Sequence, residues 1–160
     1  MEPKLRSAIR ATHRLERGKA PAHRTGECAH SLTVARSSTI EDYLDELRST
    51  ILEHGWAVQF VESDRTPYAY TIGLHDCGLP ELLLTGLTPQ RAARLLNRVA
   101  EMTIRDGPPT PGDQLQVPAG PLVEAVTVDH PDAHMDMAVA FYANPQLRAL
   151  QLVWADRDGR

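Results

Sequence analysis

The sequence has few of the features that stabilise small secreted proteins or anchor a protein in a membrane. Its 160 residues include two cysteines, Cys28 and Cys77, which are too few for a disulfide framework. No apolar run approaches the roughly 20 residues that a membrane-spanning helix needs. The basic start is not followed by the apolar segment of a secretory signal. We therefore expect a reduced, cytoplasmic protein with no membrane partner.

The sequence also lacks the short motifs of several large enzyme classes. It contains no P-loop, no Rossmann glycine fingerprint, no Gly-x-Ser-x-Gly elbow and no Cys-x-x-Cys pair. These absences disfavour ATP-driven chemistry and serine hydrolysis. They indicate no cofactor, and we expect none.

Charge is distributed unevenly along the chain. Residues 1–36 carry eight Lys/Arg and three Glu, a net charge of +5, whereas residues 37–160 carry nine Arg and eighteen Asp/Glu, a net charge of −9. An acidic globular part does not favour nucleic acid as a partner, so only the basic N-terminal extension could contact a phosphate backbone. Low apolar content predicts that residues 1–37 are mostly disordered and that residues 38–160 form a single domain.

Hydrophobic periodicity after residue 38 predicts an alternation of helices and strands. A capping box at Ser38 begins the first helix, and Gly55 ends it. Further helices are predicted at 89–105 and 135–142, and strands at 56–61, 68–74, 81–87, 114–117, 122–128 and 150–154. Short connections between strands favour an antiparallel or mixed sheet. The predicted fold class is therefore α+β, with five to six strands and about three helices packed on one side of the sheet.

The strand predicted at 68–74 has two very different faces. One face carries bulky residues from Tyr68 to Leu74, which is typical of a core. The opposite face carries only the small residues Ala69, Thr71 and Gly73. Such a bare face allows close approach, either by a flat ligand or by a packed helix, and both alternatives stay open.

The densest polar cluster of the chain, His75-Asp76-Cys77-Gly78, follows this strand. Cys77 would be a nucleophile if His75 lowered the pKa of its thiol, and the alternative is a hairpin loop in which Asp and Gly serve the turn. Glu81 begins the next strand, either as a general base or ligand anchor, or as a structural acceptor for backbone N–H groups. We predict a ligand site at Thr71, Gly73, His75 and Glu81, with His75, Cys77 and Glu81 as the catalytic candidates of an enzyme.

Two histidines with metal-ligand spacing lie near the predicted third helix. His130 and His134 are four residues apart, and on a helix this spacing places both imidazoles on one face. Pro131 favours a helix start after His130, and the Glu of the zinc-protease motif is absent. We therefore expect capping or surface histidines and no metal, with His75 as the third ligand in the alternative.

Several segments, taken together in order and spacing, resemble the domain-of-unknown-function 4262 family over about residues 27–160. They are Trp56 with Glu62, Tyr68-Ala-Tyr-Thr-Ile-Gly-Leu74, Pro80-Glu-Leu-Leu-Leu-Thr-Gly-Leu87, Leu95-Leu-Asn97 and Leu150-Gln-Leu-Val-Trp-Ala-Asp156. The resemblance implies a bacterial protein of a family without an assigned activity or cofactor. No catalytic residue is therefore carried over.

This chain departs from the family pattern at both ends. Cys28-Ala-His30 resembles part of the Cys/His-containing stretch with which members often open, but Thr25 stands where a second cysteine is expected. Members also tend to continue past the final Asp-Arg-Asp-Gly, so we expect the last strand to be less well covered. An uncovered apolar strand would favour a homo-oligomer.

These observations favour a binding module for a small molecule or a protein. The alternative is an enzyme, either a flavin-dependent oxidoreductase or a metal-dependent hydrolase that uses His75, His130 and His134. The flavin alternative rests on a fold-level analogy, because a strand of the Ala-x-Thr-x-Gly type also occurs in flavin-reductase split barrels. The absence of Lys and Arg along residues 66–90, where a flavin phosphate would need a partner, counts against it.

Overall fold

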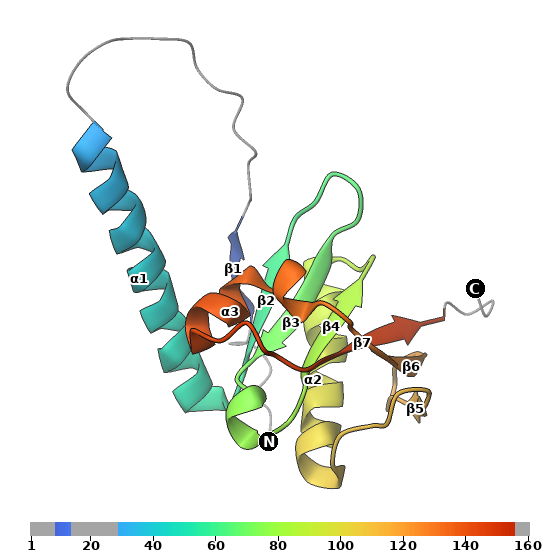
Figure 1. The fold of residues 1–160 in the computed structure, drawn as a ribbon. Coiled ribbons are helices and arrows are strands. Elements are labelled where there is room, and N and C mark those ends of the chain that lie inside the picture. Colours follow the sequence, from blue (N-terminus) through green and yellow to red (C-terminus); the bar gives the residue numbers. More distant parts are fainter. Residues whose placement is uncertain (1–8, 14–28, 156–160) are drawn as a thin grey trace.

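The computed structural model describes the backbone of residues 9–13 and 29–155, and side chains from Ile40 onward (Figure 1). Three α-helices, two short 3₁₀ helices and seven strands follow one another along these residues. In chain order they are β1 (Ile9–His13), α1 (Ala29–His54), β2 (Ala57–Val61), β3 (Tyr68–Ile72), η1 (His75–Cys77), β4 (Glu81–Thr85), α2 (Pro89–Asp106), β5 (Gln114–Gln116), β6 (Leu122–Thr127), η2 (Pro131–Ala133), α3 (Asp136–Tyr142) and β7 (Ala149–Trp154).

The strands form one mixed sheet in the order β1-β2-β3-β4-β7-β6-β5. β1 pairs with β2, and β4 with β7, in parallel, while the other neighbours are antiparallel. The predicted α+β class is confirmed, and β2 to β7 are the six strands that periodicity indicated. β7 lies between β4 and β6, so both of its edges are paired within the sheet, and the homo-oligomer stays a prediction.

The N-terminal part of the described chain contains two features that the sequence analysis did not predict. β1 lies within residues 1–37, which were predicted to be mostly disordered. Residues 1–8 and 14–28 lie outside the described residues. α1 begins at Ala29, so the proposed capping box at Ser38 lies inside the helix. No glycine or proline occurs between Ala29 and Ser38, so nothing there stops a helix from extending.

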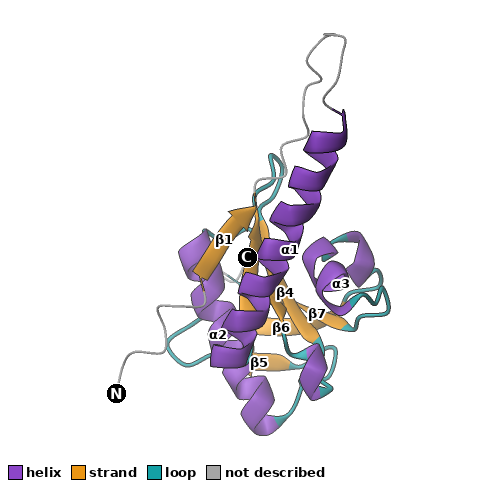
Figure 2. Cartoon of the chain, turned by 90° about the vertical axis from the view of Figure 1, so that its left-hand side faces the viewer, coloured by secondary structure: helices purple, strands orange, loops and turns teal. Residues whose placement is uncertain are grey.

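The prediction that the helices pack on one side of the sheet was wrong, because they cover both faces. Figure 2 shows α2 and α3 on opposite sides of the strands. One buried cluster joins the inner face of α2 to β2, β3, β4, β6 and β7. A second cluster joins Leu47 of α1 and Ala138 of α3 to the other face of the same sheet. The apolar residues on both faces of β4 require this double cover.

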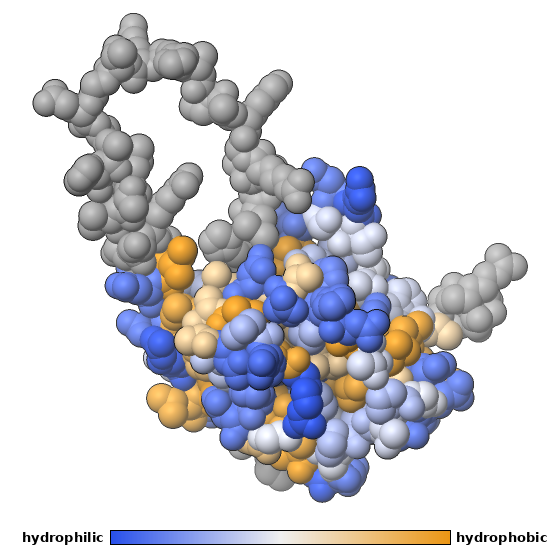
Figure 3. Space-filling model, viewed as in Figure 1, coloured by the Kyte–Doolittle hydropathy of each residue, from blue (hydrophilic) through white to orange (hydrophobic). Residues whose placement is uncertain are grey.

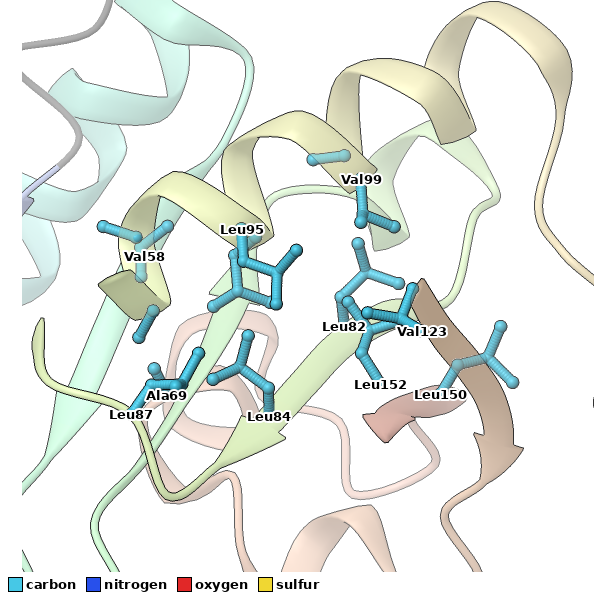
Figure 4. Close-up of a cluster of buried hydrophobic side chains, with 14 of the residues drawn as sticks. Val58, Ala69, Leu82, Leu84, Leu87, Leu95, Val99, Val123, Leu150 and Leu152 are labelled. Carbon is cyan, nitrogen blue, oxygen red and sulfur yellow. The ribbon is translucent and has the colours of Figure 1, made fainter. Parts of the chain in front are cut away.

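The α2 face is a continuous apolar layer (Figure 4). Thr88 precedes the helix and Pro89 occupies its first turn, a common arrangement at a helix start. Leu95 and Val99 of α2 lie over Leu82 and Leu84 of β4 in the close-up. At its edge the Trp56 indole N–H donates to the Asn97 side-chain oxygen at 2.9 Å.

The opposite face combines apolar packing with contacts made by tyrosines and an arginine. Tyr43 of α1 donates a hydrogen bond to the side-chain oxygen of the buried Gln59. The Arg48 guanidinium lies 5.7 Å from the centre of the Phe141 ring, which connects α1 to α3. The Met137 N–H donates to the Tyr70 hydroxyl at 3.1 Å, so a polar contact also holds the start of α3.

The surface seen in Figure 3 is mostly hydrophilic, with hydrophobic residues gathered beside α1 and near the end of β7. Among the helices in the described part of the chain, none combines the length and the apolar character needed to cross a membrane.

Candidate functional site

Glu81 is the centre of a hydrogen-bonded cluster at the first residue of β4. Its side chain is fully buried, and four donors surround its carboxylate. Oε1 accepts from the Gly73 N–H at 3.0 Å, the His75 N–H at 3.1 Å and the Tyr142 hydroxyl at 2.6 Å. Oε2 accepts from the Thr71 hydroxyl at 2.6 Å. We call Thr71, Gly73, His75, Glu81 and Tyr142 the Glu81 cluster.

Thr71 connects the two strands that hold the carboxylate. Its hydroxyl donates to Glu81 and accepts the Leu82 N–H at 2.9 Å. The β3–β4 register ends at the pair Tyr70 and Leu83, so this hydroxyl serves Leu82 where the ladder ends. A side chain without a hydroxyl would leave both buried groups without this partner.

Gly73 allows β3 to turn toward Glu81. Its φ of +127° lies in a region that residues with a side chain rarely adopt. A Cβ at this position would lie 2.8 Å from the Gly55 carbonyl oxygen and 2.9 Å from the Trp56 Cα. Both are backbone atoms, so neither can move aside cheaply. The glycine is required for the conformation that directs its N–H at Glu81 and, at 2.5 Å, at the Tyr142 oxygen.

Tyr142 closes the cluster from a distant part of the chain and was missed by the sequence analysis. It is the last residue of α3, where the periodicity indicated only an amphipathic helix. Its ring is half-buried and contacts the ring of His75, with 4.8 Å between the centres and an angle of 57°. The sequence held one weak indication of this role. A tyrosine on the core-facing side of a short helix needs a hydrogen-bond partner for its buried hydroxyl, but the sequence does not show which residue that is.

Burial dominates the electrostatics of the cluster. Desolvation raises the pKa of Glu81 above its ordinary value of 4.5, and its four hydrogen bonds oppose this effect. Burial also raises the pKa of Tyr142, and the negative charge of Glu81 raises that pKa further. None of the ion pairs found among the described residues includes Glu81. The carboxylate is therefore held by hydrogen bonds alone in this part of the chain.

The loop above the cluster is η1, whose last residue is followed by Gly78 in a left-handed conformation. Gly78 donates its N–H to the His75 carbonyl, and its own carbonyl accepts from the Arg148 guanidinium at 2.8 Å. Cys77 is exposed, and none of the hydrogen bonds within the described ranges joins its thiol to the His75 ring. This geometry fits the hairpin turn in which Asp76 and Gly78 serve the turn. The role of Cys77 as a nucleophile stays a prediction.

The bare face of β3 is filled by the chain itself. Ala69 is fully buried in the cluster covered by α2, and Thr71 is fully buried as well. The backbone at Gly55 and Trp56 closes over Gly73. Close packing, the second of the two alternatives, is therefore what the structure has. A flat ligand such as a flavin finds no open surface along this face.

The two histidines with metal-ligand spacing flank η2 instead of sharing a helical face. His130 precedes this 3₁₀ helix and His134 follows it, and both are exposed. Among the side chains that the structure describes, no three His, Cys, Asp or Glu are grouped so that they could hold a metal ion. The set of His75, His130 and His134 therefore does not assemble, because η2 is too short to align its flanking side chains. Cys28 lies outside the described residues.

Comparison with known proteins adds a family but no activity. A family model described as a domain of unknown function (DUF4262) matches residues 50–160, which is more than half of the chain. No curated protein matches the chain, and no solved structure matches it. The matched range contains β2 to β7, α2, α3 and all five residues of the Glu81 cluster.

Proposed function

This chain belongs to the DUF4262 family, a domain of unknown function, and from this premise we propose that it is a small-ligand-binding module. The site lies where β3 ends and β4 begins, beside the Glu81 cluster. Four residues predicted for a ligand site, Thr71, Gly73, His75 and Glu81, meet here. One observation supports the proposal most directly: a fully buried carboxylate accepts the hydroxyl of the partly buried Tyr142, whose ring contacts the partly buried ring of His75.

The residues of the cluster divide into a buried support and an accessible rim. Thr71 and Gly73 hold the carboxylate but are themselves buried, so they position Glu81 and do not touch a ligand. His75 and Tyr142 retain exposed surface, and the exposed Asp76 follows His75 directly. A ligand would therefore contact the two rings and Asp76, while Glu81 acts through Tyr142.

The chemistry of the rim favours a small organic cation. Asp76 carries a carboxylate at the surface, and the buried Glu81 side chain accepts a hydrogen bond from the Tyr142 hydroxyl. The neighbouring Phe141 ring meets Tyr142 edge-on at 5.1 Å and already lies against the Arg48 guanidinium. Aromatic faces beside carboxylates attract ammonium groups through charge and through the ring quadrupole.

We test this proposal by titrating the isotope-labelled full chain with choline while following backbone amide resonances. The neutral isostere 3,3-dimethylbutan-1-ol and the anion acetate serve as comparison ligands at equal ionic strength. We expect choline to shift the amides of Gly73, His75 and Asp76 with millimolar affinity, and the other two ligands to leave them unchanged. Arg148→Gln removes a positive charge beside Gly78 and should strengthen choline binding.

Two substitutions of exposed acids provide a matched control. Asp76→Asn should weaken choline binding severalfold, whereas Asp64→Asn, in the turn that leads into β3 at its other end, should not change it. Tyr142→Phe retains the ring but loses the hydrogen bond to Glu81, so it should weaken binding, whereas Tyr142→Leu should abolish it. If neither choline nor either comparison ligand shifts these amides, the proposed site is wrong. If the neutral isostere binds as well as choline, the site binds by shape and the cation preference is wrong.

A further inference from the structure

We propose that the outer edge of β2 is a docking surface for an extended peptide strand, and that the chain's own segment Ile9–His13 is its exchangeable occupant. The proposal is independent of the Glu81 cluster, which lies at the junction of β3 and β4. It rests on the make-up of β2, on the way β1 pairs with it, and on the position of both strands relative to the family match.

β2 would be an edge strand without β1. The sheet order places β1 outermost, next to β2, and the family match covers β2 to β7 but begins at residue 50, after β1. The part of the chain matched by the family model therefore includes β2 but not the strand that covers its outer edge. Open edges present unpaired N–H and C=O groups that readily pair with another strand.

β2 has none of the features that usually protect an edge strand. Its residues, Ala57-Val-Gln-Phe-Val61, include no charge, no proline and no glycine, and all five are buried in the structure with β1 in place. Natural edges are commonly blunted by lysine, proline or a bulge. An uncharged, regular strand at an edge therefore indicates a surface that is meant to be covered by a further strand.

The pairing of β1 with β2 is loose enough to be reversible. It is parallel, a geometry slightly less stable per residue than the antiparallel one. The register also shifts: Ile9 pairs with Val58, but Thr12 pairs with Phe60, so three steps on β1 match two on β2. Such an irregularity removes part of the ladder.

The chain between β1 and α1 is long enough for exchange. Residues 14–28, fifteen residues, separate the two elements and lie outside the described ranges. A segment of this length has an extended reach of roughly 50 Å. The occupant can thus leave the edge without any change in the six-stranded core. Recognition would then follow the strand-addition mode, in which main-chain hydrogen bonds supply most of the affinity.

We test the proposal with Thr12→Pro in the full chain, because Thr12 pairs with Phe60 and a proline lacks the N–H and interrupts a strand ladder. The readout is hydrogen exchange of the amides of residues 57–61. We expect exchange there to become about tenfold faster, equivalent to about 1.4 kcal/mol of strand pairing. A synthetic peptide of residues 7–15, added in trans, should restore the slow exchange in the variant and should bind the unmodified protein more weakly.

The controls separate strand docking from a general loss of structure. Ala20→Pro places the same substitution between β1 and α1, and a peptide with proline at the Thr12 position cannot pair regularly; neither should have an effect. His13→Pro repeats the test at the residue that pairs with Val61. Equal exchange of the β2 amides in the unmodified protein and in both β1 variants would overturn the proposal. Faster exchange that the peptide fails to reverse would overturn it as well.

Discussion

The two faces of the central sheet are held by different kinds of contact. The α2 face is a broad apolar layer in which leucines and valines of the helix and strands interdigitate. The α1/α3 face is also apolar in part, but tyrosine hydroxyls hold α3 at both of its ends. Tyr70 accepts a hydrogen bond at the start of α3, and Tyr142 donates one to Glu81 at its end.

This difference explains why the candidate site lies on the α3 side. Apolar packing is tolerant of small shifts and has no directional requirement. Hydrogen bonds to a buried carboxylate fix positions within a few tenths of an ångström and are costly when one partner is lost. A short helix held by such bonds can present its rings at a defined place, which a binding site needs.

The largest expected effect on the α1/α3 face is the loss of stability when the Glu81 carboxylate is removed. Glu81→Ala leaves the His75 N–H and two hydroxyls without their acceptor, and the Gly73 N–H keeps only the Tyr142 oxygen, so we expect a loss of roughly 3–5 kcal/mol in the free energy of unfolding. Chemical denaturation measures this loss. Leu84→Ala, a truncation in the α2 layer, serves as control and should cost roughly 2–5 kcal/mol without altering the His75–Tyr142 ring contact. Unchanged stability of Glu81→Ala would contradict the role given to the cluster.

Substitution of Gly73 by alanine should show how much of the lost stability comes from steric contact and how much from the unfavourable backbone conformation. Gly73→Ala meets backbone atoms at 2.8 and 2.9 Å in addition to an unfavourable φ, so it should cost roughly 2–5 kcal/mol. Gly112→Ala is the matched control, because its φ is +96° but no atom lies within 4 Å of the added Cβ. It should cost about 1 kcal/mol. Equal losses in thermal denaturation of the two variants would show that the contact with Gly55 and Trp56 is unimportant.

The two faces of the sheet can also be compared through the loss of one buried hydroxyl group on each. Thr71 belongs to the Glu81 cluster, and Thr103 lies on α2. Thr71→Val removes a hydroxyl that serves both Glu81 and Leu82, and it should cost about 1–3 kcal/mol. The hydroxyl of Thr103 on α2 is buried, and no partner for it is found within the described residues. Thr103→Val should therefore be neutral or stabilise the protein by up to about 1 kcal/mol. The opposite ranking in urea denaturation would refute this assignment.

The smallest expected effect is a pH dependence of the free energy of unfolding, which arises from Glu81 on the α1/α3 face of the sheet. The folded-state pKa of Glu81 is raised by burial, so the folded protein retains this proton at a pH where the unfolded chain has lost it. The contribution of the Glu81 proton to the free energy of unfolding is complete below its ordinary pKa of 4.5. This contribution decreases as the pH rises through the folded-state pKa. In Glu81→Gln this decrease should vanish. Denaturation of both proteins from pH 4 upward tests this, and parallel profiles would contradict it.

Local patterns predicted most of the secondary structure because its causes are local. Alternation from Tyr68 to Ile72 and the apolar run after Glu81 correspond to β3 and β4. The Thr88-Pro89 start of α2 follows from propensities that depend only on neighbouring residues. The interpretation of Glu81 as a structural acceptor for backbone N–H groups has the same origin, since a buried carboxylate at the start of an apolar strand needs donors. Whether this junction binds a ligand stays a prediction.

Other features depended on residues that are distant in the sequence. Tyr142 lies 61 residues from Glu81, and no pattern around either residue indicates their hydrogen bond. The bare face of β3 was compatible with a ligand or a helix, and the backbone at Gly55 and Trp56 decided the outcome. The position of β7 beside β4 likewise placed the last strand inside the sheet.

The amino-acid pattern was therefore sufficient for the fold class, the six core strands and the position of a carboxylate at the start of β4. Periodicity and turn residues act over a few neighbours, and a single sequence displays them directly. The distribution of helices over both faces, the donors that complete the Glu81 cluster and the edge filled by β1 arose only in three dimensions. They depend on which surfaces meet after collapse, and the free energy of that packing is shared among residues far apart in the chain.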